Sequence, residues 1–477
     1  MAGEDGITRG RMRRTMPLAG FTARAAGGRL VAGIREKAGD VGAVRRFHEH
    51  TAEQYAEYLG HSKGVLMKVG QMLSMVDMAH IGEGNFSPYQ KALSRLQADA
   101  PPMAPQLARD VLEADLGRTV EEIFAEFSDE PMAAASIGQV HRAVLHDGRQ
   151  VAVKIQYPGV AQAIRDDLAN TELVTTFMRL GMSATGIARV DLREMAEEIA
   201  ARISEEVDYR YEAASITAFS ELYRAHPFIR VPELIPEACG DKVLTMTFVE
   251  GLDWAAAQEA GQELKDSWGE VIWRFVGGSL CHSNLFHADP HPGNYRFGTD
   301  GSVGIVDFGC VRRYTEVQRR QIVDLMFGMG YLKPDEWRHL MVKGGFIPTD
   351  STISAEDAYS WMAEAYQEFL APQPVTYDRE TADRSARRTF SIGDPRVRQF
   401  TVPGEHTYFG RITFGINIIL GTLGCTFHAR GMIEDLAGLA DPVSPLGIQH
   451  RAWVLERGLP FGLDDHEEHR QRASRIG

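Results

Sequence analysis

The alternation of apolar and polar residues between positions 139 and 155 predicts a pair of antiparallel strands. The segment QVHRAVLHDGRQVAVKI alternates on both sides of Asp147-Gly148, a dipeptide typical of tight hairpin turns. Successive side chains of a strand point to opposite faces. The apolar face of the second strand therefore consists of Val151, Val153 and Ile155. Ala152 and Lys154 lie on its other face.

Helical patterns account for most of the remaining chain. Residues 41–80 are mostly good helix formers without proline, and apolar or small residues recur there at i, i+4 and i+7. Further helices are expected over 104–115, 158–182, 190–222 and 263–284. Residues 242–251 predict a strand that leads into a connector. Beyond Arg313 the chain is expected to be mainly helical, with a loop over 372–404.

The longest uncharged run is ITFGINIILGTLGCTF, from Ile412 to Phe427. It is shorter than the roughly 20 apolar residues that a membrane-spanning helix needs, and Asn417 and three glycines interrupt it. We therefore expect a buried core helix here. The start of the chain lacks the continuous apolar region of a secretory signal.

Composition and charge narrow the function classes. The chain has 477 residues, of which 44% are hydrophobic and 24% charged, as in ordinary globular proteins. The formal net charge of −14 disfavours a nucleic-acid partner. The four cysteines are scattered without CxxC spacing, which argues against a structural zinc site or a disulfide framework and favours a reducing compartment.

The N-terminal segment is rich in arginine and has no acidic residue between positions 9 and 35. Its arginines are Arg9, Arg11, Arg13, Arg14, Arg24, Arg29 and Arg35. Interleaved apolar residues suit an arm that lies on an anionic membrane surface. A mitochondrial transit peptide has a similar composition, although Glu4 and Asp5 count against it. A solvated basic arm is the third interpretation.

The stretch FHADPHPGNYRFGTDGSVGIVDFGC, from Phe286 to Cys310, concentrates the candidate chemistry. Asn294 and Asp307 are oxygen ligands of the kind that Mg²⁺ prefers, and Asp289 could orient or deprotonate an acceptor. Their order and spacing are those of a kinase catalytic loop followed by a metal loop. The alternative is a pair of polar turns that flank two strands.

Two upstream features test the kinase interpretation. Lys154, on a predicted strand, could hold the α- and β-phosphates, and Glu212, on a later predicted helix, could hold the lysine. In place of a glycine-rich loop the chain has PMAAASIGQVHRA, in which Gly138 is the only glycine. The backbone amides of this alanine-rich turn could face phosphates, and tight packing is the other explanation. No GxxxxGK[ST] motif occurs, which excludes a Walker-type nucleotide site.

Several motifs together resemble the UbiB/AarF/ADCK family of atypical kinases. They are MKVGQMLSM, LSRLQADAPPM, AAASIGQVHRA, VAVKIQYPGV, EEVDYRYEA and HADPHPGN, within about residues 50–315. The resemblance implies an α+β, protein-kinase-like bilobal fold. It has a small β-rich N-lobe, a helical C-lobe and an N-terminal helical extension that covers the active site. It also implies binding of Mg²⁺ and ATP or ADP, and atypical kinase or ATPase activity.

The resemblance also implies roles for individual residues. Lys68, Gly70 and Gln71 match the KxGQ motif, and Glu206 and Asp208 match an ExD motif suited to pair with Lys68. Asp289, Lys154 and Glu212 would complete the catalytic set, with Asn294 and Asp307 as metal ligands. The nucleotide-binding set would be Ala133, Ala134, Ala135, Ser136, Gly138, Val140, Ala152, Lys154, Met246, Thr247 and Val249, with 247–249 as the hinge.

The predicted organisation has four parts. A basic arm occupies 1–40, the helical extension 41–117, the N-lobe with inserted helices 118–248, and the C-lobe with the catalytic and metal loops 249–477. The sequence departs from the family in two ways. Many members carry a membrane-spanning helix, which is not visible here, and no Ala-Pro-Glu follows Asp307. Attachment would then be peripheral, and a regulated activation loop is not expected.

The function implied is that of a Mg-nucleotide-dependent kinase or ATPase supporting isoprenoid quinone biosynthesis or lipid homeostasis. The alternatives are a small-metabolite phosphotransferase of the aminoglycoside- or choline-kinase type and a nucleotide-binding scaffold without turnover. Expected partners are nucleotide, an anionic membrane, and a lipid or quinone-precursor ligand, without nucleic acid. We expect a cytoplasmic protein, peripheral on the inner face of the membrane if its arm binds lipid. In a eukaryote the expected compartment is the mitochondrial matrix.

Overall fold

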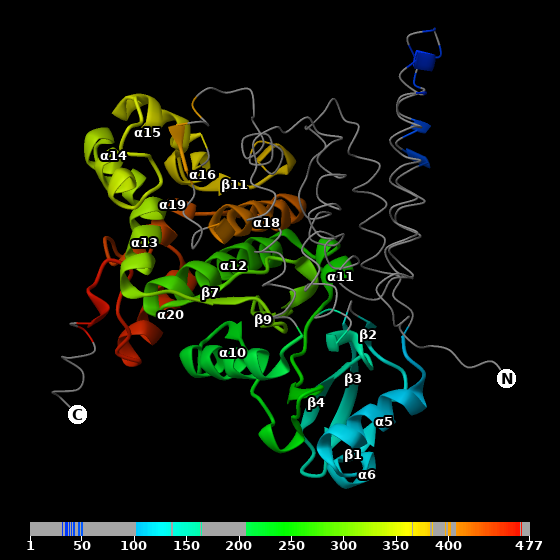
Figure 1. Cartoon of the computed structure of the whole chain (residues 1–477). Helices are drawn as coiled ribbons and strands as arrows, with labels where there is room; N and C mark the ends of the chain where they lie inside the picture. The colour runs from blue at the N-terminus through cyan, green and yellow to red at the C-terminus, as the bar shows by residue number, and fades with distance from the viewer. Residues whose placement is uncertain are drawn as a thin grey trace. The chain divides into compact units, whose positions relative to one another are not determined.

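The computed structural model describes residues 102–134, 137–162, 207–364, 366–381 and 407–467, with isolated positions near 31–50, 164, 384–401 and 469. The chain forms two compact units (Figure 1). The sheet unit comprises Met1–Ala213 and Leu234–Phe248. The helical unit comprises Ala214–Glu233 and Val249–Gly477.

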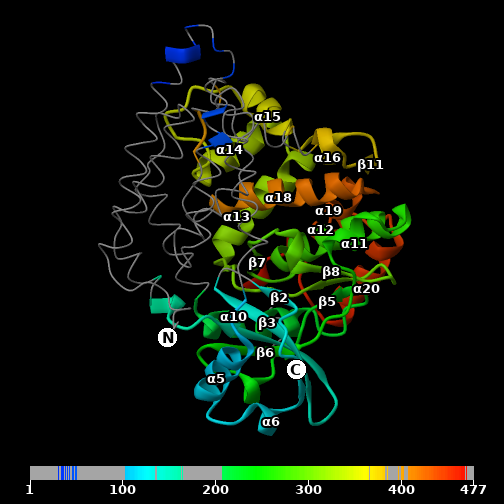
Figure 2. The ribbon, with the colours of Figure 1, turned by 90° about the vertical axis from the view of Figure 1, so that its right-hand side faces the viewer.

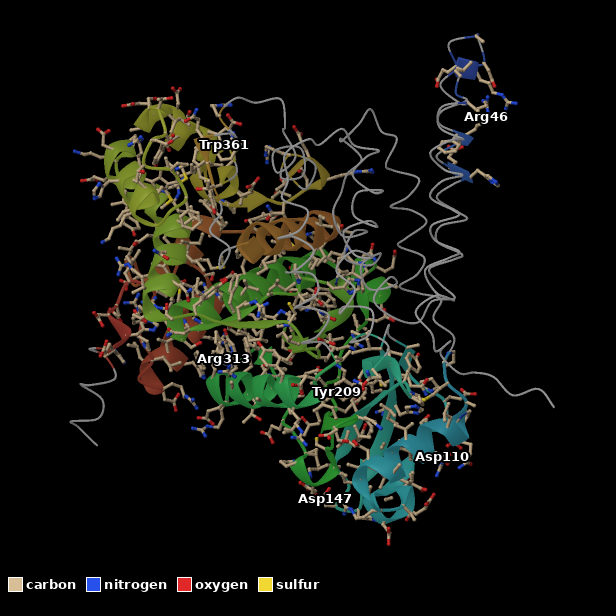
Figure 3. All side chains as sticks on the ribbon, viewed as in Figure 1. Arg46, Asp110, Asp147, Tyr209, Arg313 and Trp361 are labelled. Atoms are coloured by element: carbon tan, nitrogen blue, oxygen red, sulfur yellow. The ribbon has the colours of Figure 1, made fainter. Side chains whose placement is uncertain are left out.

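The sheet unit contains a five-stranded antiparallel sheet, with strands in the order β1-β3-β4-β6 and β2 paired with β3. The strands are β1 (Phe124–Phe127), β2 (Ala133–Ala134), β3 (Gly138–Leu145), β4 (Gln150–Gln156) and β6 (Val243–Thr247). The predicted hairpin is confirmed as β3–β4, and its turn places Gly148 at φ 88°. A positive φ suits glycine because it has no Cβ. Figure 3 labels Asp147 at this turn.

The apolar face of β4 forms the centre of the sheet unit. Val151, Val153 and Ile155 are fully buried, and they belong to a core that includes residues of α5 (Pro105–Leu116) and α6 (Val120–Ile123). The α5 helix confirms the prediction for 104–115. Neither α6 nor β1 was expected, although a capping box marks the start of α6: Thr119 Oγ1 accepts from the Glu122 amide and Glu122 accepts from the Thr119 amide.

The α10 helix (Tyr209–Leu222) lies within the predicted helix 190–222 and contributes to both units. Residues 209–213 belong to the sheet unit, and 214–222 belong to the helical unit. The Asp208 carboxylate accepts hydrogen bonds from the amides of Arg210 and Tyr211, at 3.0 and 3.3 Å. It therefore satisfies the Arg210 amide in the first turn of α10 and shares the Tyr211 amide with the Asp208 carbonyl, which lies 3.0 Å from that amide.

The helical unit is built around α12 (Gln262–His282), which confirms the helix predicted over 263–284. Every residue from Trp268 to His282 is buried. Such a helix must have neighbours on all sides. α13 (Glu316–Tyr331), α18 (Thr407–Leu423), α19 (Ala429–Ala437) and α20 (Pro445–Glu456) all contact it. The α18 helix contains most of the uncharged run and lies alongside α12 (Figure 1, Figure 2).

The other elements of the helical unit are shorter. Its helices are α11 (Trp254–Gln258), α14 (Pro334–Lys343), α15 (Ala355–Ala363) and α16 (Gln367–Leu370). Its strands are β5 (Ile229–Arg230), β7 (Leu285–His287), β8 (Tyr295–Phe297), β9 (Val303–Ile305), β10 (Val311–Arg313), β11 (Val375–Thr376) and β12 (Thr426–Phe427). The 3₁₀ helices η1 (Pro236–Ala238) and η2 (Pro292–Asn294) lie in the sheet unit and the helical unit, respectively. The predicted loop at 372–404 thus contains a short strand, β11.

A buried ion network joins three helices of this unit. Arg274, on α12, donates to Glu270 at 2.8 Å and to both carboxylate oxygens of Asp435, on α19, at 3.0 and 2.7 Å. Ser444, the N-cap of α20, donates to Glu270. The Arg274 and Asp435 side chains are only 1% and 2% exposed. The network therefore fixes α19 and the start of α20 relative to α12.

Three buried histidines form a second network with a single consistent set of tautomers. His226 Nδ1 accepts from the amides of Phe228 and Ile229, so its proton is on Nε2, which donates to His450 Nδ1 at 2.9 Å. His450 then donates through Nε2 to His282 Nε2, also at 2.9 Å. His282 donates through Nδ1 to the carbonyl of Pro460, at 2.7 Å. All three rings are thereby satisfied in the neutral form.

We predict that Asp435→Ala lowers the free energy of unfolding by about 3–5 kcal/mol, because Arg274 would remain buried without its bidentate partner. Urea unfolding followed by circular dichroism measures the change. Asp441→Ala is the matched control, because its side chain is 94% exposed and pairs with Arg451 at the surface. Equal losses in the two variants would contradict a special role for the buried network.

We also predict that stability falls as the pH drops below about 6.5. Burial lowers the pKa of His226 to about 2 and that of His282 to about 4, and it holds the pKa of His450 well below its usual value. In the unfolded chain these imidazoles titrate near pH 6.5, so between the two pKa values the unfolded state binds more protons. Each imidazole then removes about 1.4 kcal/mol of stability per pH unit.

Urea titrations between pH 7.5 and 5.0 measure this slope. His450→Gln should flatten it, because one of the three imidazoles no longer titrates. His146→Gln, at an exposed position of the sheet unit, should leave it unchanged. A wild-type slope that is flat across this range would refute the prediction.

Candidate active site

Lys154 and Glu212 form a largely buried ion pair within the sheet unit. Lys154 Nζ lies 2.5 Å from Glu212 Oε1, and the two side chains are 13% and 3% exposed. Lys154 also lies 5.8 Å from the centre of the Tyr209 ring, at the start of α10 (Figure 3). A lysine taken out of water needs such a partner to stay charged. The structure brings together the two residues that the sequence paired, and their catalytic role stays a prediction.

One face of the sheet collects four of the residues predicted to bind nucleotide. Lys154 lies opposite Val140 on β3, and Ala152 lies opposite Met246 on β6. Residues directly opposite one another in an antiparallel pair share a face, and so do residues two apart on one strand. Val140, Ala152, Lys154 and Met246 therefore line the face opposite to the buried Val151. The flat adenine ring of a nucleotide could pack on this face.

The alanine-rich segment begins with a tight pairing of β2 on β3. Ala133 lies opposite Val140, and Ala134 lies opposite Gln139. Gly138 has a packing reason to be glycine, since a Cβ there would lie 2.4 Å from the Ile155 carbonyl oxygen. The predicted contacts of this segment with phosphate remain a prediction, and Ala135 and Ser136 lie outside the described residues.

The other predicted residues of this half of the site have different settings. Thr247 ends β6, opposite Val151. Val249 belongs to the helical unit, where its side chain fills the space above Gly304 on β9. Asp208 caps α10, the helix that carries Glu212. Lys68, Gln71 and Glu206, like Gly70, lie outside the described residues.

In the helical unit, two small antiparallel strand pairs hold the three predicted loop residues. β7 pairs with β10, and β8 pairs with β9. Asp289 follows β7, Asn294 precedes β8, and Asp307 follows β9. Asn294 Nδ2 donates to Asp289 Oδ2 at 2.8 Å and to the Asp289 carbonyl at 3.2 Å.

The loop after β9 is fixed by further hydrogen bonds. The Val306 amide donates to the Asn294 carbonyl at 2.9 Å, which ties this loop to the one after β7. The Gly309 amide donates to Asp307 Oδ1 at 3.0 Å. His287 Nε2 donates to the Asp307 carbonyl at 2.8 Å. The backbone that carries both predicted metal ligands is thus held in place independently of any ligand.

An aromatic cluster that the sequence analysis did not identify packs against the Asp307 loop. It consists of Phe219 on α10, Phe275 on α12, His287 on β7, and Phe308. The ring centroids of Phe219 and Phe308 are 5.2 Å apart, and those of His287 and Phe308 are 5.6 Å apart. Its only local signal is the presence of an aromatic ring two residues before Asp289 and another directly after Asp307.

The side-chain oxygens of Asn294 and Asp307 suit a Mg²⁺ ion that is bound together with phosphates. Because the Asn294 amide nitrogen is engaged by Asp289, its amide oxygen is the atom left to bind a cation. Asp307 supplies a carboxylate. Within the described ranges, no group of three or more His, Cys, Asp and Glu side chains could hold a metal by itself. One or two protein oxygens supplemented by phosphates and water are the usual ligand set of Mg²⁺ in phosphoryl-transfer sites.

Comparison with known proteins assigns the family. Residues 95–337 match the ABC1 atypical kinase-like domain. The chain belongs to the ABC1 atypical kinase family. This confirms the resemblance to the UbiB/AarF/ADCK kinases and the α+β, kinase-like fold. Membership of this kinase-like family supports a phosphotransferase-type class for the chain.

Two curated relatives give the extent of the similarity. The chain is 34% identical over 268 residues to the atypical kinase COQ8B, mitochondrial, of Rattus norvegicus, covering 56% of this chain and 49% of the rat protein. It is 27% identical over 377 residues to the atypical kinase COQ8, mitochondrial, of Saccharomyces cerevisiae, covering 78% and 74%. The chain thus spans about half the length of the rat relative.

A solved structure extends the comparison. The complex of Rv3197 with erythromycin, from Mycobacterium tuberculosis, is 31% identical in sequence and superposes with a TM-score of 0.58. The match covers 87% of this chain and 99% of the other chain.

The relatives' names also bear on location. The rat and yeast proteins are described as mitochondrial, and a relative from Arabidopsis thaliana is described as chloroplastic. Among the helices that the structure describes, none combines the length and apolar character needed to cross a membrane.

We predict that Lys154→Met and Glu212→Gln are strongly non-additive in stability. Each single change leaves a buried polar or charged group without its partner, whereas the double change removes both charges. A double-mutant cycle from urea unfolding should give a coupling energy above about 1 kcal/mol. The exposed pair Arg210 and Asp241, at 2.6 Å, is the control, and Arg210→Met with Asp241→Asn should be close to additive.

Proposed function

We propose that this protein is an ATP-dependent atypical kinase or ATPase that uses Mg²⁺. Two hydrogen bonds of Asn294 carry the proposal. Its side chain donates to Asp289, and its backbone carbonyl accepts from the Val306 amide in the loop of Asp307. Membership of the ABC1 family supports the phosphotransferase class. The Lys154–Glu212 pair supplies the remaining kinase element, and we propose that it serves the same nucleotide.

In this mechanism the protein positions groups and neutralises charge. Asn294 Oδ1 and Asp307 would hold Mg²⁺, which when bound neutralises negative charge on the transferring phosphoryl group. Lys154 holds the α- and β-phosphates. Asp289 orients the attacking oxygen of water or an acceptor hydroxyl and receives its proton. A new bond then forms from that oxygen to the γ-phosphorus, and the bond to the β-phosphate oxygen breaks, with ADP leaving.

We propose further that residues 41–117 restrict access to this site. In this proposal Lys68 pairs with Glu206 and Asp208, and Gln71 lies beside it, so that the extension excludes protein substrates but admits nucleotide. The support is the sequence motif. The hydrogen bonds of Asp208 to the first turn of α10 leave one of its carboxylate oxygens, Oδ2, for such a contact.

For the cellular role we propose support of isoprenoid quinone biosynthesis or lipid homeostasis. The similarity to proteins named COQ8 and COQ8B supports this choice over a small-metabolite phosphotransferase or a scaffold without turnover. The Arg-rich N-terminus would then contact anionic membrane, and a lipid or quinone precursor would be the second ligand. Phosphate release from ATP, measured with and without anionic liposomes, tests this role. No stimulation by liposomes would count against it.

We predict that Asp307→Asn abolishes the thermal stabilisation that Mg-ATP gives to the wild type. A ligand that binds only the folded state raises the melting temperature through mass action, and Asp307 is a proposed metal ligand. Differential scanning fluorimetry with ATP, with and without Mg²⁺, measures the shift. Asp300→Asn, in the exposed turn between β8 and β9, is the matched control and should keep the shift. An undiminished Mg-ATP shift in Asp307→Asn would refute the assignment.

A further inference from the structure

The α18 helix approaches the Asp289 loop through a glycine. A Cβ added to Gly415 would lie 2.4 Å from Pro290 Cγ and 3.0 Å from Pro290 Cβ. Pro290 directly follows Asp289 and is buried. Contacts below 3.0 Å do not occur for real Cβ atoms, so any larger residue at 415 would force the helix or the loop to move. The loop thus rests on the helix at a position where only glycine fits.

The segment that directly follows α18 is fixed to α12 by a similar close contact. A Cβ added to Gly269, on α12, would lie 2.7 Å from Cys425 Cβ. Cys425 donates through Sγ to the Lys265 carbonyl at 3.0 Å, and the Thr426 amide donates to Asp266 Oδ1 at 2.7 Å. This contact lies near the N-terminal end of α12, and the C-terminal end of the same helix leads into β7 and the Asp289 loop.

The inner face of α18 makes it a stiff support. Its residues Ile412, Ile416, Ile419 and Leu420 are all at most 2% exposed. Interiors of this kind are close-packed and transmit a displacement instead of absorbing it. A glycine inside a helix is less favourable than an alanine, so the close approach to Pro290 is a reason for glycine at this place.

We propose that Gly415 is a positioning residue, through which α18 holds Pro290 and thereby sets the position of the Asp289 carboxylate. The inference rests on the proposed function for the role of Asp289, and on the structure for the contact. Asp289 must lie within hydrogen-bond reach of the proton that it receives. A misplacement of about 1 Å by a change outside the reacting groups can reduce turnover by about 100-fold.

The test is Gly415→Ala. Its Cβ would displace the Pro290 ring, so kcat for Mg-ATP-dependent phosphate release should fall at least about 10-fold. The dissociation constant for ATP without Mg²⁺ should change less than about 2-fold, because Lys154 and the predicted nucleotide-binding face belong to the sheet unit. If Gly415→Ala only destabilised the fold, a smaller fraction of the protein would be folded. Circular dichroism at the assay temperature would detect that loss.

Two further variants make the test specific. Gly330→Ala, on α13, is the matched control, since no atom lies within 4 Å of its added Cβ, and it should keep wild-type kcat. Pro290→Ala removes the Cγ atom that the new methyl would strike. In that background Gly415→Ala should lower kcat less than about 3-fold, compared with about 10-fold in the wild type. Wild-type kcat in Gly415→Ala, or equal losses in both backgrounds, would overturn the proposal.

A readout without turnover separates this inference from the proposed function. Hydrogen exchange of a peptide covering 286–294 reports the order of the loop, in which the Ala288 amide donates to Cys310 and the Asn294 amide donates to His291. Gly415→Ala should accelerate exchange there and Gly330→Ala should not. If the wild type hydrolyses no ATP, the proposed function fails while this comparison still decides whether α18 positions the loop. Unchanged exchange in Gly415→Ala would then overturn the inference.

Discussion

Burial of α12 on every side is the constraint on which the helical unit depends. Because the helix cannot face water anywhere from Trp268 to His282, its neighbours are fixed by packing, and its polar groups must be satisfied internally. The Arg274 network and the histidine chain meet that need at different points along it. The segment that leaves its C-terminal end enters β7 and the Asp289 loop, so the position of the candidate chemistry follows from the packing of this one helix.

Local sequence signals identified the parts of the site that depend on local geometry. The period of two around Asp147-Gly148 gave the β3–β4 hairpin and placed Lys154 away from the core, and spacing alone singled out Asp289, Asn294 and Asp307. The short α6 helix was missed although its capping box is visible in the sequence. A helix of four residues is too short for the spacing of its apolar residues to identify it.

Contacts between distant parts of the chain could not be predicted in this way. His226 and His450 are 224 positions apart, and Pro290 and Gly415 are 125 apart, so neither pair has a local pattern. The aromatic cluster around Phe308 likewise combines two helices with strand β7 and the loop after β9. Such groups depend on tertiary packing, and a single sequence carries no periodicity that reports it.

The histidine chain has a consequence for how this protein can change over generations. Each ring accepts on one side and donates on the other, and the direction is set at one end by the amides of Phe228 and Ile229 and at the other by the carbonyl of Pro460. A substitution that reverses one member would bring two donors or two acceptors face to face. Single changes tolerated at positions 226, 282 and 450 should therefore keep a donor and an acceptor in the same order, whereas changes that reverse this order should arise only as coordinated sets.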